Sequence, residues 1–151
     1  MFNLNKMKKQ LITFILISIT ISSCNNDLIE VNCESLNRTG IKYYLDDSLF
    51  NGNCLQYSGV VLKENKLFKN GMHKKTVGYY DTGEIKYRGG MKNDSINGTY
   101  KEFYKSGKLA KKGKFKMGFY DGKWQFIRED GVILRITIFK NGQVISETDK
   151  I

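Results

Sequence analysis

The chain repeats itself with a period of 24 residues, and this repeat limits what its 151 residues can fold into. One glycine in each unit marks the period, at Gly83, Gly107 and Gly131. An aliphatic residue follows two positions later and a large apolar residue six positions after that: Ile85, Leu109 and Ile133, then Met91, Phe115 and Phe139. Units this short cannot bury a core alone, so the period predicts that they stack side by side.

Each unit is expected to form a β-hairpin. In the clearest unit, residues 98–104 predict one strand, residues 105–107 a turn and residues 108–115 the returning strand. A turn that ends in glycine suits a type I turn with a bulge, because glycine accepts the left-handed conformation at little cost. The matching turns are 81–83 and 129–131, and Lys69-Asn70-Gly71 and Lys140-Asn141-Gly142 are expected to join one hairpin to the next.

The composition agrees with strands and tight turns. The sequence has 15 glycines, nine tyrosines, nine phenylalanines and no proline, and aromatic residues favour strands. Two weaker units, 43–52 and 57–71, precede the clear ones. We therefore expect an all-β fold of antiparallel hairpins, forming an elongated twisted meander over residues 40–147. Before it we expect a tether and cap (24–39), and after it a tail (148–151).

Further glycines keep the register of the repeat: Gly98 and Gly122 open matching segments, and Gly118 and Gly142 close two units, with Asp94 in the equivalent place. The pattern Gly-x-Tyr/Trp-x-x-aromatic, turn Gly, aliphatic, Phe-x-x-Gly resembles MORN repeats. It is most similar to the bacterial variant in YwqK-type antitoxin-like proteins. The resemblance covers residues 67–142 and fails at Lys74 and Thr76. It implies a β-repeat architecture, and the family name implies toxin neutralisation.

The first 23 residues have the layout of a removable secretory signal, and we expect this segment to be helical. Lys6, Lys8 and Lys9 precede an apolar run, residues 11–21, that is too short to span a bilayer comfortably. Ile21-Ser22-Ser23-Cys24 then resembles the lipobox of bacterial lipoproteins, which implies cleavage before Cys24 and lipid attachment to its thiol. We expect an exported chain that is lipid-anchored to the cell envelope. The residue after Cys24 is not aspartate, which favours the outer membrane if the cell has one.

Two cysteines remain after lipidation, Cys33 and Cys54. An exported compartment is oxidising, so the pair is a candidate disulfide, with two separate buried thiols as the alternative. A zinc site would need further cysteine or histidine ligands. We expect no metal and no cofactor.

The sequence offers little for catalysis. His73 is the only histidine, and its place near a turn between units predicts an exposed side chain. Glu129 and Asp130 fall on a predicted turn tip, where they are expected to be solvated. We find no phosphate-binding loop and expect no catalytic residues, no small-molecule substrate and no enzyme activity.

The formal net charge of +10 raises the question of anionic partners. Export argues against nucleic acid. We expect the lysines of the repeats to form a solvated sheet face that blocks edge pairing, with attraction to anionic lipid headgroups as the functional alternative. These lysines are Lys101, Lys105, Lys108, Lys111, Lys112, Lys114 and Lys116.

Four aromatic residues recur on the strands: Tyr80, Tyr100, Tyr104 and Trp124. We expect them to form a core ladder, with a peptide- or glycan-binding groove as the alternative. Residues 132–139 are apolar on both faces of a strand, so the N-terminal segment, a fold-back of the sheet or a partner should cover the second face. The sequence thus predicts a membrane-tethered, non-enzymatic module that binds a protein or an envelope surface, and toxin neutralisation is the second hypothesis.

Overall fold

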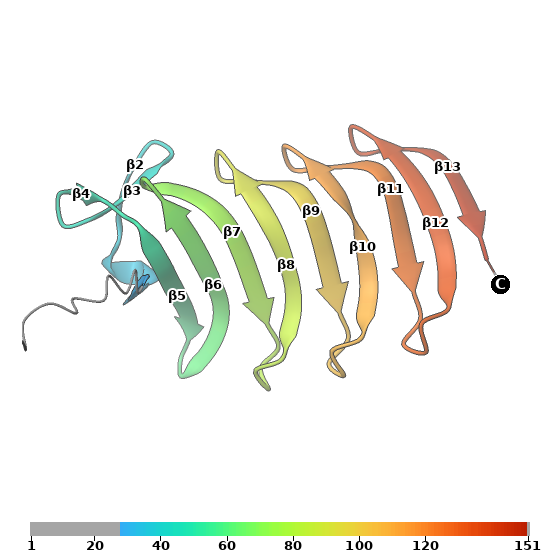
Figure 1. The fold of residues 1–151 in the computed structure, drawn as a ribbon, viewed down its shortest axis with the longest axis horizontal. Helices are drawn as coiled ribbons and strands as arrows, with labels where there is room; N and C mark the ends of the chain where they lie inside the picture. Colours follow the sequence, from blue (N-terminus) through green and yellow to red (C-terminus); the bar gives the residue numbers. More distant parts are fainter. Residues whose placement is uncertain (1–27, 151) are drawn as a thin grey trace, which may run out of the picture.

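The computed structural model describes residues 28–150, and most of them lie in one ten-stranded sheet (Figure 1). The strand order is β1-β5-β6-β7-β8-β9-β10-β11-β12-β13, so from β5 onward each strand pairs with the next one along the chain. These strands are β5 (Gly52–Ser58), β6 (Val61–Lys69), β7 (Met72–Tyr79), β8 (Ile85–Lys92), β9 (Ser95–Phe103), β10 (Leu109–Lys116), β11 (Phe119–Ile127), β12 (Ile133–Lys140) and β13 (Gln143–Asp149). The expected all-β antiparallel meander is confirmed.

Two kinds of turn alternate along the meander. At the glycine that marks the period, the N–H of Gly83 donates to Tyr80 O and the N–H of Tyr80 donates to Glu84 O. This is the predicted type I turn with a bulge, and Gly107 and Gly131 have the same positive φ as Gly83. The turns that alternate with these have two residues with positive φ, as in Asn70-Gly71 and Asn141-Gly142, which is the type I′ geometry that suits twisted strands. The first turn of the meander, Gly59-Val60, has positive φ at Gly59 alone.

The N-terminal part departs from the prediction. The meander begins at Gly52 and not at residue 40, and it continues to Asp149. Residues 37–49 form a separate three-stranded sheet of β2 (Asn37–Thr39), β3 (Lys42–Leu45) and β4 (Ser48–Leu49). Residues expected in the tether instead form β1 (Ile29–Asn32), which pairs in parallel with β5. A parallel pair needs a crossover, and the short helix η1 (Cys33–Ser35) and the small sheet provide it.

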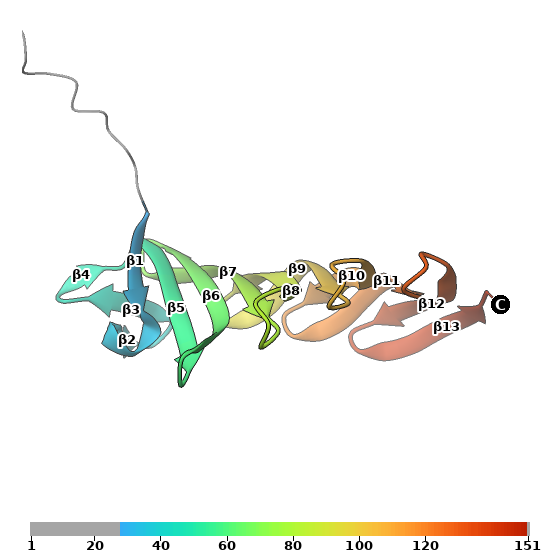
Figure 2. The same ribbon diagram turned by 90° about the horizontal axis from the view of Figure 1, so that it is seen from below.

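The long sheet is a single layer with two different faces, and the small sheet lies at one end of it (Figure 2). The face that carries Tyr87, Tyr100, Phe115, Trp124 and Phe139 is called the aromatic face, because these rings contact one another in sequence. The opposite face carries the lysine face, defined as Lys75, Arg88, Lys101, Lys112, Lys114 and Lys123.

A compact cluster closes the end of the sheet beside the small sheet. Phe50, Cys54 and Phe68 are buried there, and residues of β1, η1 and β3 pack against them. Backbone hydrogen bonds join the two sheets, since the N–H of Tyr43 donates to Gly71 O and the N–H of Gly71 donates to Phe50 O. The cluster therefore holds the small sheet on the first hairpins.

Cys24 and the expected helical signal segment lie outside the described residues. Within residues 28–150, no helix has both the length and the apolar character needed to cross a membrane.

Candidate functional site

Trp124 is the centre of the aromatic face. Its side chain is 0% exposed and its ring lies 4.3 Å from that of Tyr120 and 5.0 Å from that of Phe115, between ring centroids. The indole N–H donates to Lys114 O across the β10–β11 pair. Tyr100 joins the same ladder through Phe115. Trp124 and Tyr100 therefore occupy a packed ladder.

Glycines on neighbouring strands make room for these rings, and the sequence analysis did not single them out. A Cβ on Gly113 would lie 2.2 Å from the Trp124 ring, and one on Gly78 would lie 2.1 Å from the Tyr87 ring. A Cβ on Gly89 would make a tight but less severe contact with the Tyr100 ring, at 3.2 Å. Gly89 and Gly113 are 24 residues apart, as are Tyr100 and Trp124. The same period could therefore have revealed them.

Tyr80 and Tyr104 lie away from this ladder, at the bulged turns that contain Gly83 and Gly107. The hydroxyl of Tyr80 donates to Phe103 O, and that of Tyr104 donates to Ile127 O, so each tyrosine ties its turn to the next hairpin. The amino groups of Lys86 and Lys105 lie over the Tyr80 ring. The structure thus separates the four predicted aromatic residues into two pairs with different roles.

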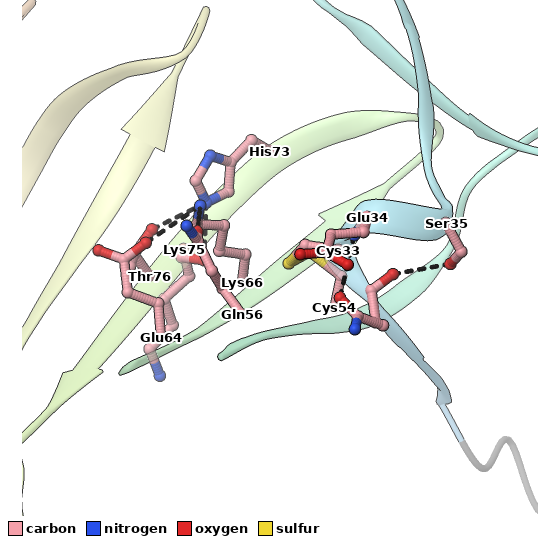
Figure 3. The surroundings of a disulfide bond; sticks show 11 residues. Cys33, Glu34, Ser35, Cys54, Gln56, Glu64, Lys66, His73, Lys75 and Thr76 are labelled. Carbon is pink, nitrogen blue, oxygen red and sulfur yellow. Dashed lines mark hydrogen bonds and ion pairs between the residues drawn. A yellow bond between two sulfur atoms is a disulfide. The ribbon is translucent and has the colours of Figure 1, made fainter. Parts of the chain in front are cut away.

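Cys33 and Cys54 form a disulfide that joins η1 to β5 (Figure 3). Their Sγ atoms are 2.08 Å apart and their Cα atoms 4.8 Å apart. Cys54 is buried in the end cluster. The bridge therefore fixes the crossover that brings β1 beside β5.

A polar cleft of about 400 Å³ lies where the small sheet meets the long one, and His73 and Thr76 line it. The prediction that His73 is exposed is wrong: it is 8% exposed, and its ring stacks on Phe68. Its Nε2 lies 2.8 Å from Thr76 Oγ1 and 3.1 Å from Lys75 O (Figure 3). Because a carbonyl only accepts, Nε2 carries the proton. Burial lowers the pKa of His73.

The charged groups of this cleft are paired with one another. Burial raises the pKa of Glu64, but hydrogen bonds from Tyr87 and Lys66 outweigh it, so that the pKa is lowered. Burial and the hydrogen bond to Glu64 raise the pKa of Tyr87. Arg38 of the small sheet forms an ion pair with Asp94, with a distance of 2.7 Å between Nη2 and Oδ2. The ion pair connects β2 to the β8–β9 turn and the Glu64–Tyr87 bond connects β6 to β8, so the polar cleft is a junction between the sheets.

The lysine face is open to solvent and hollowed. One hollow of about 370 Å³ is lined by Lys75, Arg88 and Lys101, and a second of about 490 Å³ is lined by Lys101, Lys112, Lys114 and Lys123. Lys101 and Thr99 line both hollows. None of the ion pairs found within residues 28–150 involves a member of the lysine face.

The remaining sequence predictions differ in outcome. Glu129 and Asp130 lie on an exposed turn, as expected, and Asp130 pairs with Arg128. Lys111 is half-buried on the aromatic face and pairs with Glu102, so it is not part of a solvated lysine face. Within the described part of the chain, no group of three or more potential ligand side chains is placed to hold a metal ion.

The apolar strand of residues 132–139 forms most of β12, which pairs with β11 and β13. Leu134 stays partly exposed. The prediction that the N-terminal segment covers this strand is wrong for residues 29–32, because β1 lies at the other end of the sheet from β12. Cover by a partner stays a prediction.

A single-layer sheet of hairpins, with a glycine-ended turn every 24 residues, defines a β-repeat protein. Residues 96–117, which span most of β9 and β10, match the family model described as "MORN repeat variant". A search of curated proteins finds no match.

Among solved structures, the chain is similar to a mutant of S. aureus TarM in complex with fondaparinux, α-GlcNAc-glycerol and UDP. The identity is 11% and the TM-score 0.44, over 99% of this chain. The chain spans 24% of the length of that protein. This likeness is too low to indicate a shared function.

Proposed function

We propose that this chain is a membrane-tethered bacterial lipoprotein whose MORN-type sheet binds a protein partner without catalysing a reaction. One observation carries the proposal: a repeat-variant match lies within a one-layer sheet that offers two long faces. Repeat proteins of this kind use extended surfaces for binding.

The state of the polar groups supports binding over catalysis. In the polar cleft Glu64 bonds to Tyr87 and Lys66, and Asp94 pairs with Arg38. His73 is buried and donates through Nε2 to backbone and hydroxyl oxygens. A general base needs a substrate proton within hydrogen-bond reach, and these groups are already engaged with the fold.

The lipid anchor rests on the sequence and on the disulfide. The lipobox-like segment ends at Cys24, and a Cys33–Cys54 bridge suits an oxidising compartment outside the cytoplasm. Cys24→Ala should leave the chain unprocessed or release it to the soluble fraction, measured by fractionation and intact mass. Cys54→Ser is the matched control and should keep the lipid. A Cys24→Ala chain that stays membrane-bound at its mature mass would contradict the anchor.

The binding function is tested by capture. The full chain, used as bait in detergent-solubilised envelope, should retain a protein that a Trp124→Ala bait loses, because that variant removes the centre of the aromatic ladder. A Val60→Ala bait, changed at an exposed loop residue, is the control and should retain it. No protein retained by the wild-type bait, or equal recovery with all three baits when circular dichroism shows that the Trp124→Ala sheet has unfolded, would rule out a protein partner of the folded sheet.

Toxin neutralisation is the second candidate, favoured by the resemblance of the repeats to YwqK-type proteins. A toxin gene beside the gene for this chain would support it. The measurement is growth of cells that produce the toxin with and without this chain, and unchanged growth would exclude neutralisation.

A further inference from the structure

We propose that the lysine face binds an extended acidic segment of the partner protein. The inference rests on the proposed function and names the surface and the chemistry of the partner. Lysine side chains on solvent-facing sheets usually serve solubility alone, but the arrangement of these lysines is unusual.

Three of the cations stand directly opposite one another on adjacent strands. Arg88 of β8 is paired in register with Lys101 of β9, and Lys101 is paired with Lys112 of β10. Directly opposite residues have Cβ atoms about 5 Å apart, and like charges at such positions destabilise a sheet. The fold therefore keeps an unfavourable row that a bound anion would relieve.

The lysine face has too few carboxylates to neutralise the positive charge of this row. Asp121 is the only acid among the residues that line the two hollows, and it lies opposite Lys114 on the neighbouring strand. Other nearby acids are paired elsewhere: Glu102 pairs with Lys111 on the aromatic face, and Asp94, in the β8–β9 turn, pairs with Arg38. Among the residues that line the two hollows, the cations therefore outnumber the one carboxylate, Asp121.

The shape of the face favours a chain over a flat surface. The two hollows share Thr99 and Lys101, so they adjoin across β9. With strands about 4.8 Å apart, the stretch from β7 to β11 is about 19 Å long. An extended peptide rises about 3.3 Å per residue, so about six residues would fill it.

The chemistry of the hollows favours a peptide over a nucleic acid. No aromatic side chain lines either hollow, whereas single-stranded nucleic acids are bound by stacking of bases on aromatic rings. Thr99 and Gln125 line the second hollow, and an amide such as that of Gln125 can both donate to and accept from a peptide backbone. The lysines then pair with carboxylates on the side chains of the segment.

The test measures fluorescence anisotropy of a labelled oligoglutamate peptide with the full chain in detergent. We expect saturable binding that weakens with salt. Replacing the row by Arg88→Gln, Lys101→Gln and Lys112→Gln should weaken it about tenfold, as the loss of three exposed ion pairs implies. The control carries Lys42→Gln, Lys69→Gln and Lys140→Gln, which remove the same charge at exposed positions outside the face and should have little effect.

Other outcomes overturn the inference. Equal weakening by both variants would show an effect of net charge alone. Tighter binding of oligothymidylate or of phosphatidylglycerol vesicles, with the same dependence on the row, would assign the face to nucleic acid or membrane. The row variant is also used as bait in the capture experiment. If it retains the partner that the wild-type bait retains, the proposed function stands and this inference fails.

Discussion

Adding a single methyl group at Gly113 should destabilise the sheet, because the Trp124 ring occupies the space where a side chain would begin. A Cβ on Gly113 would lie 2.2 Å from Trp124 Cδ2 and 2.3 Å from Cε2. Atoms of these types do not approach closer than about 3 Å, and close-packed interiors yield little. The ring must therefore move by about 1 Å or the strands must separate.

The magnitude follows from two opposing effects. The fully buried ring is held by Tyr120, Phe115 and its hydrogen bond to Lys114 O, so moving it costs about 1–3 kcal/mol, as overpacking does. Replacing glycine by alanine also restricts the unfolded chain, which stabilises the fold by about 0.4–1 kcal/mol. The φ of Gly113 lies outside the left-handed region, so backbone strain adds nothing. We expect a net loss of about 1–2 kcal/mol.

The assay is urea unfolding followed by circular dichroism, carried out as a double-mutant cycle with Trp124→Ala. Once the ring is absent, Gly113→Ala should be neutral or slightly stabilising. A coupling free energy near zero, with the same effect of Gly113→Ala in both backgrounds, would refute the packing argument. Because Trp124 is the only tryptophan, its fluorescence should also shift to longer wavelength in the Gly113→Ala single variant.

Three further predictions concern other parts of the fold. Replacing Cys33 and Cys54 by serine should lower the free energy of unfolding by about 3 kcal/mol in the chain-entropy model, because the bridge spans 21 residues; an unchanged urea midpoint would contradict this. Burial lowers the pKa of His73 in the folded state, so the contribution of the neutral ring to the free energy of unfolding is complete above the unfolded-state pKa of about 6.5. This contribution is lost as the pH falls from about 6.5 toward the folded-state pKa. The urea midpoint of the wild type should therefore be lower at pH 5 than at pH 8, and the difference should be smaller in His73→Gln. Lys101→Gln should stabilise the chain by about 0.5 kcal/mol at low salt, with the gain shrinking at high salt, and a loss of stability there would show that the cross-strand row is not repulsive.

The 24-residue period was enough to predict most strands and turns of the long sheet. Gly83, Gly107 and Gly131 locate the bulged turns, because such a turn requires one residue with positive φ. The aliphatic residues at the same interval, Leu109 and Ile133, begin the returning strands β10 and β12. A fixed period works for the fold because each hairpin contacts only its neighbours.

The N-terminal end could not be predicted in the same way. The period fails before residue 57, and the parallel pairing of β1 with β5 joins residues that no local pattern relates. The burial of His73 could not be predicted for a related reason. Its turn is short, but the small sheet packs over it and buries the ring against Phe68, which only the tertiary structure reveals.

The candidate sites were predicted in part. The sequence indicated aromatic residues at fixed spacing, but it could not separate the buried Trp124 from Tyr104 at a turn. It also indicated lysines on the strands without showing their register. The row of Arg88, Lys101 and Lys112 depends on which residues oppose one another across three strands, and bulges in β8–β10 shift that register from a simple count.

Crosslinking in living cells tests whether the sheet holds a protein partner on its lysine face. A photoreactive residue at Thr99, which is exposed between the two hollows, should yield one discrete crosslinked protein whose contact segment is acidic. The same residue at Ser106, on an exposed turn, should not. No crosslink from Thr99, or the same products from both positions, would contradict the claim.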